Sequence, residues 1–316
     1  MKLPFHTLDV FTDRTFGGNQ LGVFPDAAHH PTDLLHRIAA EMNIAETVFL
    51  GPPETAAGAA RVRIFTPKVE LPFAGHPTVG TAIFLAGRIR AAGERPGRGD
   101  RAGGETPGEL TLVLEEGVGP VPVEVRFERG LPAFARFTTA ILPEHRPSPH
   151  AHADLAALVG LSATDLCPDG LAPEMVSCGL PYHIIPVRSV DAVRRATLDL
   201  ARWRTMLAGT WAHHVYVVSL EAEGEEVDVR VRMFAPGSGV PEDPATGSAA
   251  ASLGGYLAVV DGRAEGRLAW TVEQGLEIDR PSLLYVEADR SGGRTTAVRV
   301  GGRAVEVSEG VMTVPD

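Results

Sequence analysis

The pattern of hydrophobic and polar positions along this chain predicts many strands and few helices. Two segments, residues 78–91 and 246–259, are apolar on almost every side, which is typical of a helix buried inside a fold. The helical spacing of residues 32–42 and 196–207 predicts two more helices. Alternating or β-branched runs predict strands at residues 44–50, 110–115, 121–127, 214–220, 283–288 and 297–300. Residues 88–108 and 143–149, rich in Gly, Arg, Glu or Pro, are predicted to be exposed loops.

The chain also repeats itself, which fixes the positions that should be structurally equivalent. In the first half Arg63 opens the run RIFTPKVELPFAGHPTVGTA, and in the second half Arg232 opens the run RMFAPGSGVPEDPATGSAA. Both runs place Phe and Pro in the same order before a stretch of Pro, Gly and small residues. With a shift of two residues in the loop, the predicted pairs are Phe65 with Phe234, Pro67 with Pro236, His76 with Asp243, Pro77 with Pro244, Gly80 with Gly247, and Thr81 with Ser248.

Weaker matches precede these runs in the same order. GGNQLGVFP around Gly18 resembles CGLPYHIIP around Gly179, and a helical pattern and an apolar strand follow each of them, which makes Tyr216 the predicted counterpart of Glu46. Three blocks in one order indicate duplication. We therefore predict an α+β fold of two pseudo-symmetric halves, each a curved, mainly antiparallel sheet around a central buried helix, with the active site in the cleft between them. The predicted halves are residues 1–128 and 129–300, and residues 301–316 form a segment that could return to the first half.

Composition narrows the class of protein. A chain of 316 residues with 44% hydrophobic residues can bury a large core. A net charge of -11 would repel nucleic acid, and no cluster of Lys and Arg offsets it. The longest apolar stretch is short for a membrane span and rich in small residues, so we expect a cytoplasmic protein. Cys167 and Cys178 could form one bridge, but free, buried thiols fit the absence of a secretion signal better.

Glu46 is the first candidate for chemistry. In the predicted strand IAETVFL, period two places it on one face with Ile44, Val48 and Leu50, and that face should be buried. Burial raises the pKa of a carboxyl group toward the range in which it can accept and return a proton. The alternative is that Glu46 lies at a sheet edge or in a salt bridge. Tyr216, its predicted counterpart, could not act as a base near neutral pH, so the asymmetry favours a proton shift over a symmetric two-base inversion.

The two apolar helices supply the second set of candidates. Gly80 and Gly247 would leave the N–H groups of a helix start open to a substrate carboxylate, assisted by the hydroxyls of Thr81 and Ser248. The alternative is that these hydroxyls only cap the helices. His76 and Asp243, predicted immediately before the helix starts, could face the same anion or Glu46; the alternative is that both are loop residues bonded to the backbone.

Other patterns point to no further chemistry. Neither His150 and His152 with Asp154 nor the pair His213 and His214 is accompanied by a recognisable ligand set, so we predict no metal. Cys167 and Cys178 do not fall at equivalent points, which disfavours a cysteine racemase. GGNQLG lacks the spacing of nucleotide-binding loops, so it reads as a turn that could line the cleft.

The motifs AETVFL, PFAGHPTVGTA and EDPATGSAA, together with GGNQLGVF, SCGLPY and VEQGLEIDRPSLLYV, resemble those of the PhzF-like family of phenazine-biosynthesis isomerases. The resemblance spans nearly the whole chain and implies a diaminopimelate-epimerase-like fold. It also implies a cofactor-free, commonly dimeric enzyme that isomerises a small carboxylate-bearing substrate of the dihydro-hydroxyanthranilate type. By resemblance Glu46 is the proton shuttle, and the family's His, Asp and Ser positions correspond to His76, Asp243 and Ser248. We predict Glu46, His76 and Asp243 to be catalytic. Together with the helix-start residues, the predicted substrate-binding residues are Asn19, Gly75, Gly80, Thr81, Gly247 and Ser248. The alternatives are a racemase or epimerase of an amino or hydroxy acid, and a non-catalytic binding protein.

Overall fold

The computed structural model describes residues 1–92, 108–168 and 170–315, and the chain forms two compact units. The first comprises Met1–Thr138 with Gly301–Asp316, and the second comprises Thr139–Val300. The predicted boundary after residue 128 falls between two strands that both belong to the first unit. No described helix is long and apolar enough to cross a membrane.

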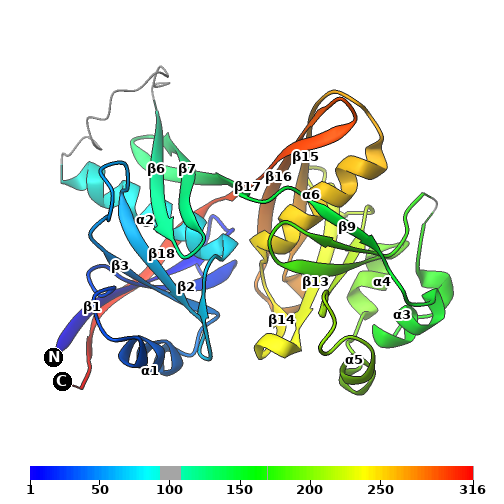
Figure 1. The fold of residues 1–316 in the computed structure, drawn as a ribbon, viewed down its shortest axis with the longest axis horizontal. Coiled ribbons are helices and arrows are strands. Elements are labelled where there is room, and N and C mark those ends of the chain that lie inside the picture. Colours follow the sequence, from blue (N-terminus) through cyan, green and yellow to red (C-terminus); the bar gives the residue numbers. More distant parts are fainter. Residues whose placement is uncertain (93–107, 169, 316) are drawn as a thin grey trace. The chain divides into compact units, whose positions relative to one another are not determined.

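The first unit is built on a mixed sheet (Figure 1). Its strands are β1 (Lys2–Val10), β2 (Asn19–Phe24), β3 (Glu46–Gly51), β4 (Ala60–Phe65), β5 (Glu70–Leu71), β6 (Glu109–Glu116), β7 (Gly119–Glu128), β8 (Leu131–Thr138) and β18 (Ala304–Thr313). The pairs β18–β1, β1–β2, β3–β4, β4–β5, β6–β7 and β7–β8 are antiparallel, whereas β2–β3 and β4–β6 are parallel. The C-terminal strand β18 thus pairs with the N-terminal strand β1.

Two helices pack on this sheet. Helix α2 (Gly75–Ala91) is central and contacts strands β1, β2, β3, β6, β7, β8 and β18. Its apolar surroundings explain why the sequence is apolar on almost every side of this helix. Helix α1 (Thr32–Met42) is amphipathic and buries Leu35 and Ile38 in a separate cluster with Phe24, Phe49 and Phe65. Because α2 continues to Ala91, the predicted loop at residues 88–108 begins too early, and residues 93–107 of it lie outside the described part of the chain.

The second unit repeats the same order of pairs. Its strands are β9 (Glu144–Pro147), β10 (Glu174–Ser177), β11 (Pro181–Pro186), β12 (His214–Ser219), β13 (Val229–Ala235), β14 (Val240–Asp243), β15 (Gly266–Gln274) and β16 (Ser282–Ser291), and β17 (Arg294–Gly302) crosses the division. β9–β10, β10–β11, β12–β13, β13–β14 and β15–β16 are antiparallel; β11–β12 and β13–β15 are parallel. The segment 143–149, predicted to be a loop, therefore contains a paired strand. The prediction missed it because a strand of four residues is too short to show a clear alternation of apolar and polar positions.

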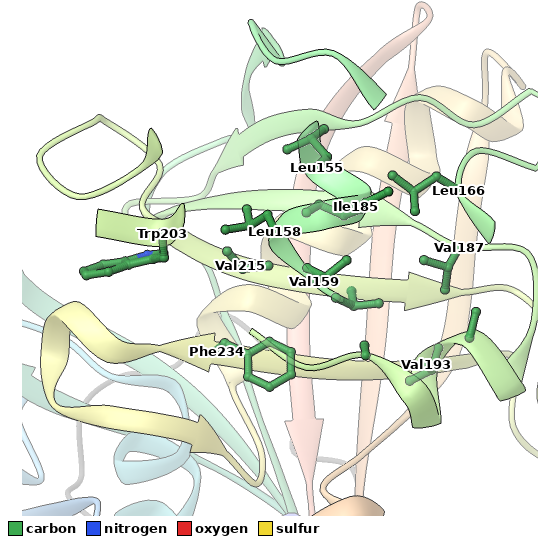
Figure 2. Packing of buried hydrophobic residues seen from close by; sticks show 14 of the residues in the cluster. Leu155, Leu158, Val159, Leu166, Ile185, Val187, Val193, Trp203, Val215 and Phe234 are labelled. Atoms are coloured by element: carbon green, nitrogen blue, oxygen red, sulfur yellow. The ribbon is translucent and has the colours of Figure 1, made fainter. Parts of the chain in front are cut away.

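Helix α6 (Gly247–Asp261) is the central helix of the second unit, and three short helices pack outside: α3 (His152–Leu158), α4 (Val190–Arg195) and α5 (Leu200–Met206). Residues 196–207, predicted as one helix, thus begin at the residue that caps α4 and contain α5. Figure 2 shows the cluster that joins these helices to the sheet, in which Leu155, Leu158 and Trp203 pack toward Val215 and Phe234. The short 3₁₀ turns of this unit are η1 (Ala163–Asp165), η2 (Pro236–Ser238) and η3 (Leu276–Ile278).

A matched pair of arginines strengthens the evidence for duplication. Arg63 Nε donates to Glu70 Oε1 at 2.8 Å, and its Nη1 donates to main-chain oxygens just before α1. Arg232 Nε donates to Glu242 Oε1 at 2.8 Å, and its Nη1 donates to main-chain oxygens in and just after α4. In each unit, one arginine therefore ties the same hairpin to the outer helical layer.

The strand registers correct the predicted counterpart of Glu46. Glu46 pairs with Leu21, and the next residue of β3 pairs with Phe65. In the second unit His214 pairs with Tyr182, and the next residue of β12 pairs with the equivalent phenylalanine, Phe234. The counterpart of Glu46 is therefore His214 and not Tyr216. The prediction was wrong because a uniformly apolar strand gives no internal marker of register.

The helix starts correct the second set of predicted pairs. Leu71 and Asp243 occupy equivalent positions in the hairpins, facing Ile64 and Met233, and both central helices begin four residues later, at Gly75 and Gly247. His76 thus matches Ser248 rather than Asp243, and Gly80 and Thr81 do not match Gly247 and Ser248. The alignment failed because the additional residues of the second unit lie earlier in the hairpin, where η2 forms.

Candidate active site

Glu46 and His76 meet inside the first unit. Glu46 is the first residue of β3, and His76 is the second residue of α2. His76 Nε2 lies 3.2 Å from Glu46 Oε2, and the two side chains are 5% and 16% exposed. Residues that are far apart in sequence are brought together because α2 runs along the inner face of the sheet to which β3 belongs. A carboxyl group and an imidazole in this arrangement can hold and exchange a proton.

The imidazole of His76 is neutral. Burial lowers the pKa of His76 to about 3, and the hydrogen bond to a main-chain oxygen opposes this shift only in part. That oxygen belongs to Gln20, lies 3.3 Å from Nε2, and can only accept a hydrogen bond, so we place the hydrogen of His76 on Nε2. The same Nε2 atom lies 3.2 Å from Glu46 Oε2, so the neutral imidazole borders the carboxyl as well as the main-chain oxygen of Gln20.

The other predicted residues of the first unit lie around the same helix start. Asn19 begins β2 and is 1% exposed, and Gly75 is the buried first residue of α2. Gly80 and Thr81 lie in the second turn of the helix rather than the first, and Thr81 is fully buried. Gly75 is therefore the chain neighbour of His76, and Asn19 precedes Gln20, whose main-chain oxygen contacts His76, while Gly80 and Thr81 lie a turn further along α2.

Gly80 has a packing role that a substitution can measure. A Cβ atom at this position would approach Leu21 Cδ2 to 2.6 Å and Val10 Cγ2 to 2.7 Å. Gly80→Ala is expected to lower the free energy of unfolding by about 1–3 kcal/mol, because helix and sheet would have to separate. Chemical denaturation measures this change. Unchanged stability with a raised KM would instead favour the substrate-binding role predicted from the sequence.

The candidate residues of the second unit surround the start of α6. Asp243 ends β14, is 8% exposed, and accepts a hydrogen bond from Thr246 Oγ1 at 2.5 Å. Gly247 is the buried first residue of α6, and Ser248 Oγ lies 2.6 Å from Tyr182 Oη. Asp243 is thus held by the turn that leads into the helix, and the Ser248 hydroxyl is engaged by a tyrosine.

Several polar residues near these helix starts were not predicted from the sequence. Gln274 Nε2 donates to the main-chain oxygen of Asp243 at 2.7 Å and to Thr246 Oγ1 at 3.0 Å. Tyr216 donates to Gln274 Oε1 at 3.4 Å, and burial, Tyr182 and Asp243 raise the pKa of Tyr216 further above neutrality. Burial also lowers the pKa of His214 to about 4. The motif VEQGLEIDRPS contains Gln274, but only the fold shows what it holds.

The predicted absence of a metal site can be compared with the side-chain clusters. Among the described residues, His6, Glu306 and Glu309 form one group of potential ligand atoms, all within 4.8 Å of one another. His6 Nδ1 is 2.5 Å from Glu306 Oε1, while His6 Nε2 lies 3.4 Å from the guanidinium of Arg88. A cation there would have to displace one partner and approach a positive charge, so this group is better explained as a hydrogen-bonded contact between buried His6 and Glu306, with Arg88 on the other ring nitrogen.

The thiols provide a further contrast with the epimerases that use paired cysteines. Cys167 and Cys178 are both free and half-buried, which agrees with the predicted absence of a bridge but not with complete burial. Cys178 precedes β11 and its main-chain N–H donates to Ser252 Oγ of α6, while Cys167 follows η1. The two thiols occupy unrelated positions in the second unit.

Comparison with known proteins decides the family. The family model for phenazine biosynthesis-like proteins, PhzC-PhzF, matches residues 8–310. The chain belongs to this family. An uncharacterised isomerase of Mesorhizobium japonicum is 38% identical over 97% of both chains. The trans-2,3-dihydro-3-hydroxyanthranilate isomerase of Pseudomonas aeruginosa is 33% identical over 96% of both. A PhzF-family crystal structure from Bacillus anthracis has a TM-score of 0.85 and 25% identity, and covers 99% of this chain and 100% of its own.

Membership of the PhzF family confirms three predictions from the sequence. The resemblance was correct, the α+β fold is of the diaminopimelate-epimerase-like type, and the chain is an isomerase. Two units with the same order of strand pairs around central helices account for the fold in physical terms.

Proposed function

We propose that this PhzF-family protein is a cofactor-independent isomerase that moves a proton between two carbons of a small carboxylate-bearing substrate. The observation that carries the proposal is the contact between Glu46 and a neutral, buried His76. A relative 33% identical is named as an isomerase of trans-2,3-dihydro-3-hydroxyanthranilate, which supports a conjugated cyclic acid as substrate. The homodimer implied by the resemblance stays a prediction, which analytical ultracentrifugation can check.

The proposed reaction needs one acid–base group and no electron transfer. The Glu46 carboxylate removes a proton from an acidic C–H bond, and the electron pair of that bond spreads over the conjugated system. The protonated carboxyl then returns the proton to a second carbon, so the double bond moves and the enzyme is restored. His76, whose Nε2 lies 3.2 Å from Glu46 Oε2, is assigned to holding the carboxyl in place between turnovers.

The proposal assigns the remaining predicted residues to the substrate. The first turn of a helix exposes main-chain N–H groups that favour an anion, and Gly75 and Gly247 occupy the first positions of α2 and α6. Asn19, Asp243 and Ser248 supply polar side chains close to these helix starts. Roles for Gly80 and Thr81 in substrate binding stay predictions, since both residues lie a turn further along α2.

A racemase or epimerase is the second candidate, and one observation favours it. The register of the strands gives Glu46 a titratable counterpart, His214, where the sequence alignment had placed a tyrosine. A histidine at the equivalent position of the second unit fits a reaction with two acid–base groups better than the tyrosine predicted from the sequence. The pKa of His214 is about 4, so its imidazole is neutral at physiological pH and could accept a proton but not donate one as a cation.

Proton NMR in deuterium oxide tests both candidates. The protein is incubated with trans-2,3-dihydro-3-hydroxyanthranilate and with a panel of chiral amino and hydroxy acids. An isomerase produces a shifted double bond, with deuterium at the new position to the extent that Glu46 exchanges with solvent. An epimerase produces an inverted centre that carries deuterium and leaves the skeleton unchanged. Absence of both changes with every compound would contradict the proposal for these substrate classes.

His76 provides a prediction that depends on its donor atom. His76→Leu is expected to lower kcat by about 10–100-fold, because a hydrogen bond to a charged group contributes about 1.5–3 kcal/mol. His76→Gln keeps an N–H donor and should retain more activity than His76→Leu. Because the pKa of His76 is about 3, the wild type and His76→Gln should show the same pH dependence between about pH 5 and 8. A limb near pH 6.5 that disappears in the variant would contradict a neutral His76.

A further inference from the structure

A buried carboxyl group lies next to the helix start that carries His76. Glu116 is the last residue of β6 and is 7% exposed. Its Oε1 atom lies 2.7 Å from Thr78 Oγ1, in the first turn of α2. No other described group hydrogen-bonds its Oε2 atom. A charged carboxylate in such a place would lose most of its hydration, and a hydrogen bond from one hydroxyl would compensate for only part of that loss.

The hydrogen-bond pattern around Thr78 indicates that Glu116 carries a proton. Thr78 Oγ1 lies 2.8 Å from the main-chain oxygen of Ala74, four residues earlier, as well as 2.7 Å from Glu116 Oε1. A hydroxyl has one hydrogen, and a main-chain oxygen can only accept. When Thr78 donates to Ala74, the contact with Glu116 is a hydrogen bond only if the carboxyl is the donor. Both short contacts are then satisfied at once.

Electrostatics leads to the same conclusion. Burial raises the pKa of Glu116 to about 8 even when the Thr78 hydroxyl is taken as a donor to the carboxylate, the arrangement that would lower it. The group is therefore mostly protonated at neutral pH. The imidazole of His76, on the same turn of α2, is neutral and cannot attract the charged form.

The charged side chains of the surrounding strands have partners of their own. On β4, Arg61 pairs with Glu54 at 3.1 Å, and Arg63 pairs with Glu70 of β5 at 2.8 Å. Glu115, the neighbour of Glu116 on β6, accepts hydrogen bonds from the loop after β3.

On β7, Glu124 pairs with Arg136 of β8, and the Arg126 guanidinium lies over the ring of Phe134. Glu128 of the same strand pairs with Arg303. The burial of Glu116 is thus the main influence on its proton.

The second unit shows what this position does. In the register of the parallel strands β4 and β6, Arg61 lies opposite Glu115. In the register of β13 and β15, the equivalent Arg230 lies opposite Glu273. The residue after each glutamate is then equivalent, so Glu116 matches Gln274. Gln274 uses a permanent N–H donor to hold the turn before α6, through the main-chain oxygen of Asp243 and the hydroxyl of Thr246. A protonated glutamic acid has nearly the shape of glutamine and offers one donor in the same way.

We propose that Glu116 is a positioning residue whose protonated carboxyl donates to Thr78 and holds the first turn of α2, so that His76 stays beside Glu46. Loss of this proton removes the donor, so the single hydrogen of the Thr78 hydroxyl can no longer satisfy both the Ala74 oxygen and the Glu116 carboxylate. The isomerase then loses activity on the alkaline side although Glu116 never touches the substrate. The activity part of this inference rests on the proposed function; the part that concerns the proton and the helix does not.

Thermal unfolding tests the proton without any substrate. The pKa of Glu116 is about 8 in the folded state, whereas an unperturbed glutamate, as in the unfolded chain, has a pKa of 4.5. Between these two pH values the folded state therefore holds a proton that the unfolded state has released. The stability contributed by this proton therefore falls as pH rises from about 4.5 and is lost above about 8. Glu116→Gln should show a smaller fall in Tm between about pH 6 and 9 than the wild type. Glu124→Gln, the same change at an exposed position on β7, should behave like the wild type.

Activity and a reciprocal variant complete the experiment. At pH 7, Glu116→Gln should catalyse deuterium exchange into the substrate at the wild-type rate. At pH 9, where about a tenth of the wild-type Glu116 keeps its proton, the variant should exceed the wild-type rate by up to about tenfold. Gln274→Glu should make Tm newly sensitive to alkali, which tests the matched position if Glu116→Gln folds poorly. The proposal is overturned if Glu116→Gln and the wild type have parallel Tm profiles, or if Gln274→Glu adds no pH dependence. These melting results stand whether or not Glu46 proves to be the shuttle.

Discussion

Glu46→Gln is expected to lower the rate of isomerisation, and of deuterium exchange into the substrate, by about 10²–10⁴-fold, the usual contribution of a general acid–base group. Glutamine fills nearly the same volume and can still contact His76 Nε2, but it cannot accept and return a proton. The fall should appear in kcat, whereas substrate affinity should change little, because Glu46 is assigned to proton transfer rather than to binding the carboxylate. Proton NMR in deuterium oxide measures both rates.

The control for this result is a glutamate of the same unit that lies away from the helix start. Glu41 is exposed on α1, so Glu41→Gln should retain the wild-type rate. Both variants should unfold at the wild-type temperature, since neither change opens a cavity. If Glu46→Gln kept more than a tenth of the wild-type kcat on a verified substrate, another group would have to carry the proton, and His214 would be the next to replace.

Arg230→Met is expected to produce the largest loss of stability, about 3–5 kcal/mol in the free energy of unfolding, because removal of one partner leaves buried charges uncompensated. The Arg230 side chain is 3% exposed, and its Nη1 and Nη2 atoms each lie 2.6 Å from a carboxylate, of Glu273 and Glu277 respectively. These glutamates are 21% and 11% exposed. Gln274 follows Glu273 directly, so the loss should also disturb the turn that carries Asp243.

Denaturation by urea measures this effect, and an exposed arginine of the same unit calibrates it. Arg267 is 53% exposed and contacts Asp289 at 2.8 Å, so Arg267→Met should cost less than about 1 kcal/mol. Equal losses for the two variants would show that the cluster around Arg230 is worth no more than a surface ion pair. If Arg230→Met melts at a lower temperature and has reduced activity that recovers when the assay is cooled, the result would agree with the predicted disturbance near Asp243.

Sequence patterns determined most of the local structure and the family. The two segments without a polar face became the central helices α2 and α6, because a helix that is apolar all round is stable only when strands surround it. Repeated motifs revealed the duplication, and the same motifs identified the PhzF family. Period two singled out Glu46 as a carboxyl group on an apolar strand face, whereas the choice of His76 over a loop residue bonded to the backbone came from the resemblance to the family.

Only the tertiary structure decided which residues are equivalent and which of them meet. The apolar strand at His214 contains no marker of register, so pairing with Tyr182 and Phe234 was needed to match it with Glu46. The contact between Glu46 and His76, and the buried proton of Glu116, depend on side chains from separate strands and a helix that approach one another only when the sheet wraps around α2. A sequence carries the identity of these groups, but their burial, and hence their protonation, is a property of the packed fold.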